Sequence, residues 1–294
     1  MLRIRINYKQ TYTTIINYIL DLHFLKYYNI IFMVIKMNEE NLDKYYNKFN
    51  EDKRLTRRHG IVEYTTAMTY IHQLLHKMTN PKIIDIGAGT GAYSVPLANE
   101  GYDVTAVELI KHNLMTLKDK NSPVKAYLGN ATNLSMFDDD SFDMVLLFGP
   151  LYHLISKEDK LKALKEAKRL VKKNGIILIS YYMNEYAIIT HGFRDNHILD
   201  AIKNNEVDKN YHITPRKDDL YSMVRLEDID ELNYLIGLKR IKILAQDGPT
   251  DYIRPMINKM DEKTFDEYIK YHLSTCERTE LLGASSHVLD IVKK

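Results

Sequence analysis

The sequence has a single cysteine, Cys276, and no tryptophan. One cysteine excludes an intramolecular disulfide and a zinc cluster held by cysteines, and it suits the reducing cytoplasm that we predict for the protein. An excess of charge is also missing, because 41 lysines and arginines face 39 aspartates and glutamates. Such a balanced chain has no overall field to attract nucleic acid or a membrane surface, so we predict neither as a partner.

Long hydrophobic runs are absent as well. Residues 1–36 are apolar and rich in tyrosine, but their runs are shorter than the roughly 20 residues of a membrane-spanning helix, since they are interrupted by Lys9, Asp21, His23 and Lys26. No small-residue cleavage site follows, which argues against a signal peptide. We interpret residues 1–36 either as an extra helix or as sequence upstream of a true start at Met33 or Met37. A polar, helix-compatible sequence begins at Met37 and favours the second interpretation.

The sequence does contain enough apolar residues, 45% of 294, to bury a sizeable core. Strand-like and helix-like segments alternate from residue 65, which is the pattern of an α/β, doubly wound, mostly parallel sheet. Short apolar runs predict strands at 82–86, 103–107, 124–128, 142–148 and 176–182. Apolar residues at helical spacing predict helices at 65–78, 93–99 and 114–118.

The longest helical pattern runs from Ser156 to Gly175. Ser156 and Asp159 have the spacing of a capping box, and Gly175 is the expected stop at the carboxyl end. The many lysines of this segment are expected on a solvated face. The inward face is expected to carry Leu161, Leu164, Ala167 and Leu170.

The segment after the first predicted strand passes from an apolar run through an aspartate into a glycine-rich turn, KIIDIGAGTGAYS at 82–94. Gly87, Gly89 and Ala92 fit the pattern G-x-G-x-x-[G/A], in which glycines allow a tight turn and close approach to a ligand at a helix N-terminus. Glu108, after the second predicted strand, has the spacing of a carboxylate that binds a ribose diol. Nicotinamide and adenosyl ligands both carry that diol, so these residues do not separate them.

Asp85 favours one of the two ligands. A glycine turn that binds pyrophosphate receives negative charge, which a carboxylate two residues before the first glycine would oppose. S-adenosylmethionine has no phosphate and carries an ammonium and a sulfonium, which a nearby carboxylate attracts. Asp85 therefore favours S-adenosylmethionine as the cofactor.

Asp85 to Gly91 (DIGAGTG) and Glu108 resemble the first motif and the ribose-binding acid of class I S-adenosylmethionine-dependent methyltransferases, over about residues 45–182. The resemblance implies a Rossmann-like, seven-stranded sheet that closes with an antiparallel hairpin, expected at 238–248 and 285–294. It implies cofactor contacts along the family's motifs, from Asp85, the backbone of Gly87, Gly89 and Gly91, Glu108, Asn130, Ala131 and Phe148. It also implies that FGPLYH at 148–153 lies where the methyl group meets its acceptor.

Tyr152 and His153 are therefore the candidate catalytic residues. An acceptor that must lose a proton needs a base titrating near neutrality, for which His153 is the first candidate. In the alternative role His153 orients the acceptor through a hydrogen bond. His59 and His191 are further candidates outside the motif.

Several of these residues also have a purely structural interpretation. Asp85 can accept hydrogen bonds from the turn, and Asn130 can be an ordinary turn residue. His153 can be a satisfied core histidine, and Tyr152 can serve packing alone. The sequence leaves these alternatives open.

Two long segments depart from the expected core and predict helical caps. The connection 183–224 after the fifth strand and the segment 250–283 within the hairpin are both longer than simple connections, and such insertions are often lids or binding loops. We predict a cofactor-binding core at 37–182, with a lid near its amino end at 45–64, and the rest of the core at 225–294. The two insertions are expected to enclose a small substrate.

These features predict a methyltransferase that acts on a small molecule by in-line methyl transfer. The alternative is a methyltransferase acting on RNA or protein, supported by the basic cluster at 54–59 alone. A nicotinamide oxidoreductase would leave Asp85 unexplained, and a cofactor-binding protein without catalysis stays open. No metal is predicted, because Asp138, Asp139 and Asp140 have the pattern of a solvated turn.

Overall fold

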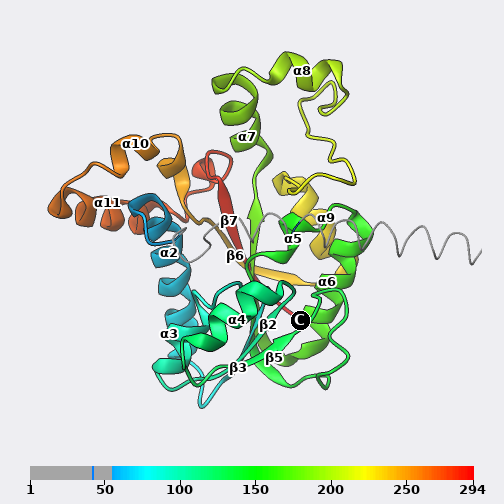
Figure 1. Cartoon of the computed structure of the whole chain (residues 1–294), viewed down its shortest axis with the longest axis vertical. Helices are drawn as coiled ribbons and strands as arrows, with labels where there is room; N and C mark the ends of the chain where they lie inside the picture. Colours follow the sequence, from blue (N-terminus) through cyan, green and yellow to red (C-terminus); the bar gives the residue numbers. More distant parts are fainter. Residues whose placement is uncertain (1–41, 43–54) are drawn as a thin grey trace, which may run out of the picture.

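One sheet organises the chain, with the strand order β3-β2-β1-β4-β5-β7-β6. All pairings are parallel except those of β7, which runs antiparallel to both β5 and β6. The strands are β1 (Lys82–Ile86), β2 (Asp103–Glu108), β3 (Lys125–Leu128), β4 (Phe142–Leu147), β5 (Val171–Tyr182), β6 (Lys239–Ala245) and β7 (His287–Lys293). The predicted fold is confirmed, including the hairpin that closes the sheet (Figure 1).

The computed structural model describes Leu42 and residues 55–294. The predictions for residues 1–36, and for most of the lid before residue 55, lie outside the described residues. Helices that pack on the sheet are α2 (Arg58–Leu75), α3 (Ser94–Asn99), α4 (Lys111–Asp119) and α6 (Lys157–Leu170), with α5 (Pro150–His153) a single turn before α6. The helix α9 (Leu226–Ile236) precedes β6.

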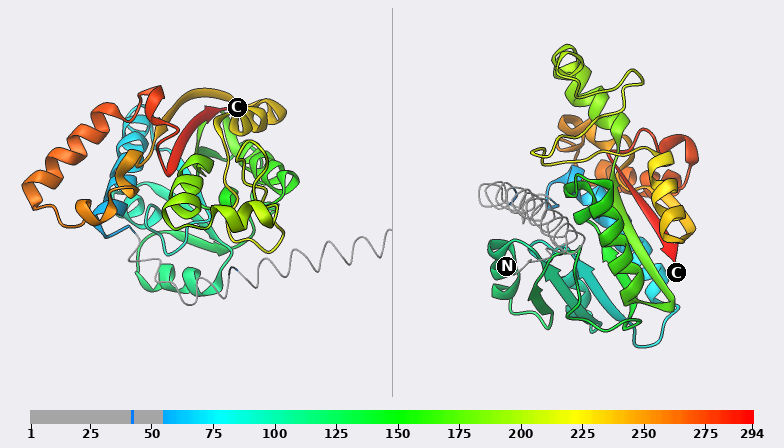
Figure 2. Two further views of the ribbon diagram at one scale, coloured as in Figure 1. Left: turned by 90° about the horizontal axis from the view of Figure 1, so that it is seen from above. Right: turned by 90° about the vertical axis from the view of Figure 1, so that its right-hand side faces the viewer.

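Alternate strand residues supply two hydrophobic layers, one on each face of the sheet. On one face Ile83 packs in a cluster with Ile71 of α2 and Leu97 of α3. On the other face Ile84 packs in a cluster with Leu164 of α6, and Leu232 of α9 joins it. The sheet is therefore covered by helices on both sides, as a largely parallel sheet must be (Figure 2).

The helix predicted at 156–175 starts as expected and ends early. Ser156 Oγ accepts a hydrogen bond from the backbone nitrogen of Asp159 at 3.0 Å, so the predicted cap is confirmed. The helix ends at Leu170, and β5 begins at once with Val171, which pairs with Phe142 of β4. The expectation that Gly175 ends the helix was wrong. A Cβ on Gly175 would lie 2.7 Å from the carbonyl oxygen of Asp143, so glycine is needed for close strand approach.

The two insertions contain short helices, and they extend in different directions (Figure 1). The first holds α7 (Asn184–Ala187), the π-helical η2 (Ile188–Arg194) and α8 (Ile198–Lys203), and it projects beyond the sheet. The second holds α10 (Arg254–Ile257), α11 (Glu262–Thr275) and the 3-10 turn η4 (Thr279–Leu281), after the turn η3 (Gly248–Asp251). Phe265 and Ile257 of the second insertion pack against Val62 of α2. The two insertions also contact each other, because the ring of Tyr186 in α7 lies 5.2 Å from that of Tyr252.

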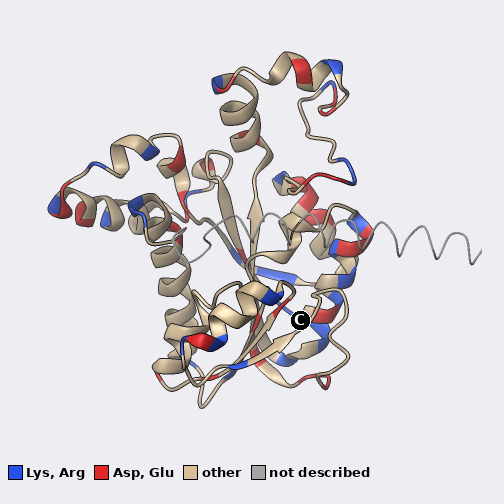
Figure 3. Cartoon of the chain, in the orientation of Figure 1, with Lys and Arg blue, Asp and Glu red and all other residues tan. Residues whose placement is uncertain are grey.

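Charged residues of both signs are interspersed along the described elements (Figure 3). The acidic turn 138–140 forms ion pairs, with Asp139 on Arg169 at 2.6 Å and Asp140 on Lys294 at 2.5 Å. Within the described residues, every helix is too short or too polar to cross a membrane.

Candidate cofactor site

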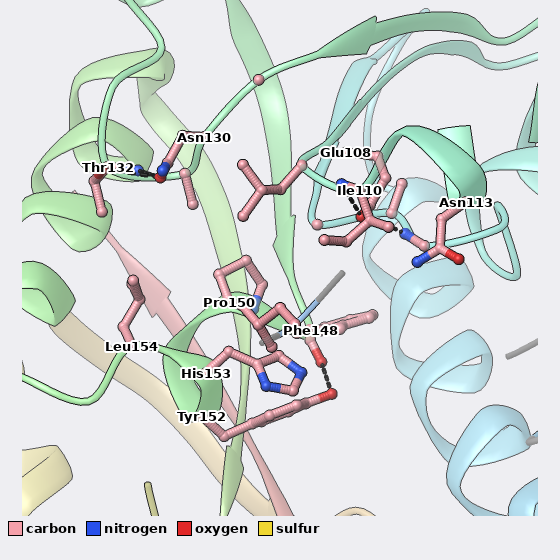
Figure 4. Close-up of a pocket in the computed structure, with 18 of the residues that line it drawn as sticks. Glu108, Ile110, Asn113, Asn130, Thr132, Phe148, Pro150, Tyr152, His153 and Leu154 are labelled. Carbon is pink, nitrogen blue, oxygen red and sulfur yellow. Dashed lines mark hydrogen bonds between the residues drawn. The ribbon is translucent and has the colours of Figure 1, made fainter. Parts of the chain in front are cut away.

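A cavity of about 280 Å³ opens where β1, β2 and β4 end, at the carboxyl edge of the sheet (Figure 4). This edge is where open α/β sheets bind their ligands. The cavity is lined by nine of the predicted site residues: Asp85, Gly87, Gly89, Glu108, Asn130, Ala131, Phe148, Tyr152 and His153. The tenth, Gly91, lies outside the lining. The structure thus brings together residues from four loops of the sequence.

The glycine turn has a backbone conformation that residues with a side chain rarely adopt. Gly87, Gly89 and Gly91 have φ angles of 78°, 56° and 87°. A Cβ on Gly87 would lie 2.6 Å from Cδ of Pro150, so this glycine lets the turn after β1 meet the turn after β4. A Cβ on Gly91 would lie 2.8 Å from Cγ2 of Val95, away from the cavity. Gly91 therefore serves the packing of the turn on α3.

Glu108 at the end of β2 connects two loops of the cavity. Its Oε2 accepts a hydrogen bond from the backbone nitrogen of Gly89, and its Oε1 accepts one from that of Ile110, both at 2.8 Å. The residue is 5% exposed. A carboxylate accepts up to about four hydrogen bonds, so backbone donors and a ribose diol can share it. Glu108 is thereby oriented by the two loops between which a ribose would lie.

Asp85 is buried in the cavity wall, 1% exposed, where Ser94 Oγ donates a hydrogen bond to its Oδ2 at 2.5 Å. Burial, and to a lesser extent the charge of Glu108, raise the pKa of Asp85 to about 7, although the hydrogen bond from Ser94 opposes the shift. Ionising Asp85 in this buried position is therefore costly. A cation in the cavity would reduce that cost.

The loops after β2 and β3 form an end of the cavity that suits a flat ring. Ile110, 5% exposed, and Ala131 provide apolar walls. Asn130 Oδ1 accepts hydrogen bonds from the backbone nitrogen of Thr132 at 3.0 Å and from its hydroxyl at 2.9 Å (Figure 4). The side chain of Asn130 thus stabilises its own turn, which agrees with the structural alternative without excluding a ligand contact.

The turn after β4 carries the candidate catalytic residues on α5. Tyr152 donates its hydroxyl hydrogen to the carbonyl oxygen of Phe148 at 2.8 Å. Nδ1 of His153 lies 2.9 Å from the carbonyl oxygen of Leu220, in the first insertion. Because a carbonyl only accepts, Nδ1 of His153 carries the proton and Nε2 the lone pair when the ring is neutral. Both side chains are near the cavity, as Figure 4 shows.

The other candidates lie elsewhere. Nδ1 of His59 pairs with Oδ1 of Asn258 at 3.0 Å, and the guanidinium of Arg58 lies over the ring of Phe265 at 5.4 Å. These contacts use the described part of the basic cluster for packing against the second insertion. The side chain of His191 is 74% exposed in η2. Leu42 and Leu55 line the cavity from before α2, and the predicted lid stays a prediction.

Sequence reasoning missed several residues of this region. Ser94, the partner of Asp85, follows the glycine turn directly, and Ile110, Asn113 and Thr132 follow predicted strands, so their positions alone were a usable signal. No local signal pointed to a second group beside the cavity. Its ligand-type atoms, from Glu63, Asp247 and His287, lie within 4.8 Å of one another.

The fold is that of the Rossmann-like methyltransferases. Residues 84–179 match a family model described as a methyltransferase domain. Residues 84–179 are thus a methyltransferase domain, which supports the predicted resemblance to class I S-adenosylmethionine-dependent methyltransferases.

Curated relatives match part of the chain. The demethylmenaquinone methyltransferase of Paenarthrobacter aurescens is 29% identical over 121 residues, 41% of this chain and 46% of the relative. The ubiquinone biosynthesis O-methyltransferase of Rickettsia typhi is 25% identical over 154 residues, 49% of this chain and 61% of the relative. The chain thus spans about half the length of these relatives.

A solved structure from Thermotoga maritima has the same fold. It is described as an S-adenosylmethionine-dependent methyltransferase, possible histamine N-methyltransferase, and superposes with a TM-score of 0.52. The two proteins are 17% identical, over 89% of this chain and 99% of the other. At this identity the likeness concerns the fold alone.

Proposed function

We propose that the protein binds S-adenosylmethionine and transfers its methyl group, by in-line displacement, to a small-molecule acceptor. The main support for this cofactor is Asp85, which is buried in the cavity wall beside the glycine turn. A pyrophosphate there would face this carboxyl group, whereas an ammonium would neutralise its charge. In the proposed complex Glu108 binds the ribose hydroxyls, and Ile110 and Ala131 contact the adenine.

The bound cofactor supplies an electrophilic methyl group on a sulfonium. The chain itself has to align the acceptor with that group and exclude water, for which proximity can contribute on the order of 7 to 11 kcal/mol. The hydrogen bond from the Tyr152 hydroxyl to the Phe148 carbonyl supports a role of both residues here, because it holds the turn after β4 at the cavity. His153 would orient the acceptor with Nε2, or take its proton.

A small acceptor is favoured by the surroundings of the cavity. The relatives named above carry names of small-molecule methyltransferases, of the quinone pathways in particular. The basic cluster that supported RNA or protein as the acceptor is partly engaged by Phe265 and Asn258. A cytoplasmic setting, which the single cysteine suits, belongs to the same proposal.

Labelled methyl transfer tests this function. The protein is incubated with S-adenosylmethionine carrying a labelled methyl group and with catechol, tyramine, histamine, total RNA or denatured cell protein. We expect label in a small phenol or amine. Label in RNA or protein alone would contradict a small-molecule acceptor, and the variant Glu108→Ala controls for transfer by a contaminant.

The titration of Asp85 predicts that cofactor binding depends on pH. Because the pKa of Asp85 is about 7, roughly a tenth of the molecules carry the ionised form at pH 6, against roughly nine tenths at pH 8. A cationic ligand needs the ionised form, so its affinity falls as the pH falls. We expect S-adenosylmethionine to bind about 10-fold more weakly at pH 6 than at pH 8 in calorimetric titrations. The variant Asp85→Asn should bind equally at both values, and an equal affinity in the wild-type protein would contradict a ligand-facing Asp85.

A further inference from the structure

A second set of side chains meets at the same edge of the sheet, beside Tyr152. Tyr182 ends β5, Asp247 follows β6, and His287 opens β7. Because β7 is antiparallel, its first residue lies at the carboxyl ends of the other strands, and His287 is the register partner of Tyr182. Their rings stack with centroids 5.1 Å apart, and the His287 ring lies 6.0 Å from that of Tyr152. His287 therefore lies next to Tyr152, whose side chain lines the cavity.

Asp247 is buried, 2% exposed, and is held by donors on both carboxylate oxygens. Its Oδ1 accepts from Ser285 Oγ at 2.7 Å and from the backbone nitrogens of Ser286 at 2.9 Å and His287 at 3.0 Å. Its Oδ2 accepts from Ser286 Oγ and lies 2.9 Å from Nδ1 of His287. Burial alone would raise its pKa, but these bonds and the His287 ring lower the pKa of Asp247 to about 2. Asp247 is therefore a carboxylate at any physiological pH.

The ionised Asp247 determines the state of the His287 ring. A carboxylate accepts hydrogen bonds and cannot donate them, so Nδ1 of His287 carries the proton. When the ring is neutral, Nε2 then carries the lone pair. Glu63 of α2 adds a second carboxylate, with Oε2 at 4.0 Å from Nδ1 of His287. Two acids beside the ring stabilise its protonated form, and the side chain is 15% exposed.

We propose that His287, oriented by Asp247 and supported by Glu63, is the base that accepts the proton of the methyl acceptor. The proposal rests on the proposed methyltransferase function and deepens it, since it specifies an acceptor that has to lose a proton: a hydroxyl or a protonated amine. The acceptor then lies against Tyr152 and Tyr182, between the cofactor cavity and His287.

The proposed methyl transfer balances in protons and electrons. A lone pair of the acceptor oxygen or nitrogen forms the bond to the methyl carbon, while the carbon–sulfur bond breaks with its electrons on sulfur. A protonated amine gives its proton to Nε2 of His287 first, which frees the lone pair, whereas a hydroxyl gives its proton as the bond forms. The imidazolium later releases the proton to solvent. No oxidant, reductant or further reactant is needed.

Two other assignments fit the contacts less well. A metal ion would need lone pairs of Asp247, yet its two oxygens already accept from five donor groups. Nδ1 of His153 faces a neutral carbonyl, whereas Nδ1 of His287 faces a carboxylate, which stabilises an imidazolium more strongly. His153 is thus the orienting residue in this assignment, and His287 the base.

Nitrogen NMR of protein labelled at its histidine rings tests the assignment of His287, and it needs neither cofactor nor acceptor. Nitrogen NMR reports the tautomer of each ring, and His287→Gln identifies the signal of His287. We expect His287 to be protonated at Nδ1 with the lone pair on Nε2, and we expect Glu63→Gln to lower its titration midpoint. The midpoint also depends on Asp251, which Arg254 pairs at 2.8 Å, and on the phenols of Tyr152 and Tyr182. A proton on Nε2, or a midpoint unchanged by Glu63→Gln, would overturn the proposal.

Methyl transfer to tyramine, which offers a phenol and an amine, provides the second readout. At saturating S-adenosylmethionine, where the titration of Asp85 does not limit binding, we expect His287→Gln to lower the rate about 100-fold to 10,000-fold and to remove the loss of rate at acid pH. Its affinity for S-adenosylhomocysteine should stay at the wild-type value, and His76→Gln, at the exposed end of α2, is the matched control. A wild-type rate in His287→Gln, or a rate abolished by a chelator, would overturn the assignment. A wild-type protein that binds no S-adenosylhomocysteine would refute the function itself, whatever the NMR result.

Discussion

Replacing Glu108 with alanine is expected to weaken the binding of S-adenosylhomocysteine by at least about 100-fold. Two hydrogen bonds from ribose hydroxyls to a carboxylate contribute about 1.5–3 kcal/mol each, and every 1.4 kcal/mol is a factor of ten in affinity. The variant also removes the acceptor for the backbone nitrogens of Gly89 and Ile110, so the two loops lose their connection. Isothermal titration calorimetry with the nucleoside measures the effect.

The control for this variant is Glu100→Ala. Glu100 follows α3, has a side chain that is 43% exposed, and pairs only with His72 among the contacts described for it. We expect Glu100→Ala to bind with the wild-type affinity. A thermal melt of Glu108→Ala separates lost contacts from lost fold, because the unpaired backbone donors cost about 1–3 kcal/mol each. Unchanged affinity in Glu108→Ala would show that this carboxylate binds no ribose.

Replacing Gly87 with alanine is expected to abolish cofactor binding and to lower the melting temperature. The new Cβ would lie 2.6 Å from Cδ and 2.7 Å from Cγ of Pro150, and the proline ring cannot rotate away. Relief requires the turns after β1 and β4 to separate, which distorts the cavity between them. We expect a loss of stability of about 2–4 kcal/mol from strain and overpacking together.

Gly101→Ala isolates the crowding from the backbone strain. Gly101 also has a positive φ angle, 97°, but a Cβ there would meet nothing within 4 Å. This variant should lose only the about 1–2 kcal/mol of a side chain in the left-handed region and should bind S-adenosylhomocysteine normally. Equal loss of binding in the two variants would contradict the role of the contact between Gly87 and Pro150.

Local patterns predicted the central fold well because each feature had a local cause. Apolar runs of the right length marked β1 and β4, and Ser156 was recognisable as a cap from its own neighbours. The glycine turn and Glu108 could be connected in advance, since strands that are parallel neighbours end at one edge of the sheet. The predicted end of α6 was wrong. Position 175 needs a glycine because the carbonyl oxygen of Asp143 lies too close for a Cβ, and the local sequence does not reveal this contact.

The second group beside the cavity could not be predicted for a related reason. Asp247 and His287 are 40 residues apart, with the second insertion between them, and they meet only because β6 and β7 pair antiparallel. Neither residue lies in a recognisable motif. His153 attracted the catalytic prediction because it lies within one. Its role, like the contacts of the other site residues with a cofactor, stays a prediction.

The central claim is that the cavity binds an adenosyl ligand without phosphate. Calorimetric titration of the purified protein with S-adenosylhomocysteine and, separately, with NADH tests it most directly. We predict that S-adenosylhomocysteine binds and that NADH does not, because Asp85 opposes a pyrophosphate at the glycine turn. Binding of NADH, or of neither ligand, would contradict the account and leave Asp85 with a structural role alone.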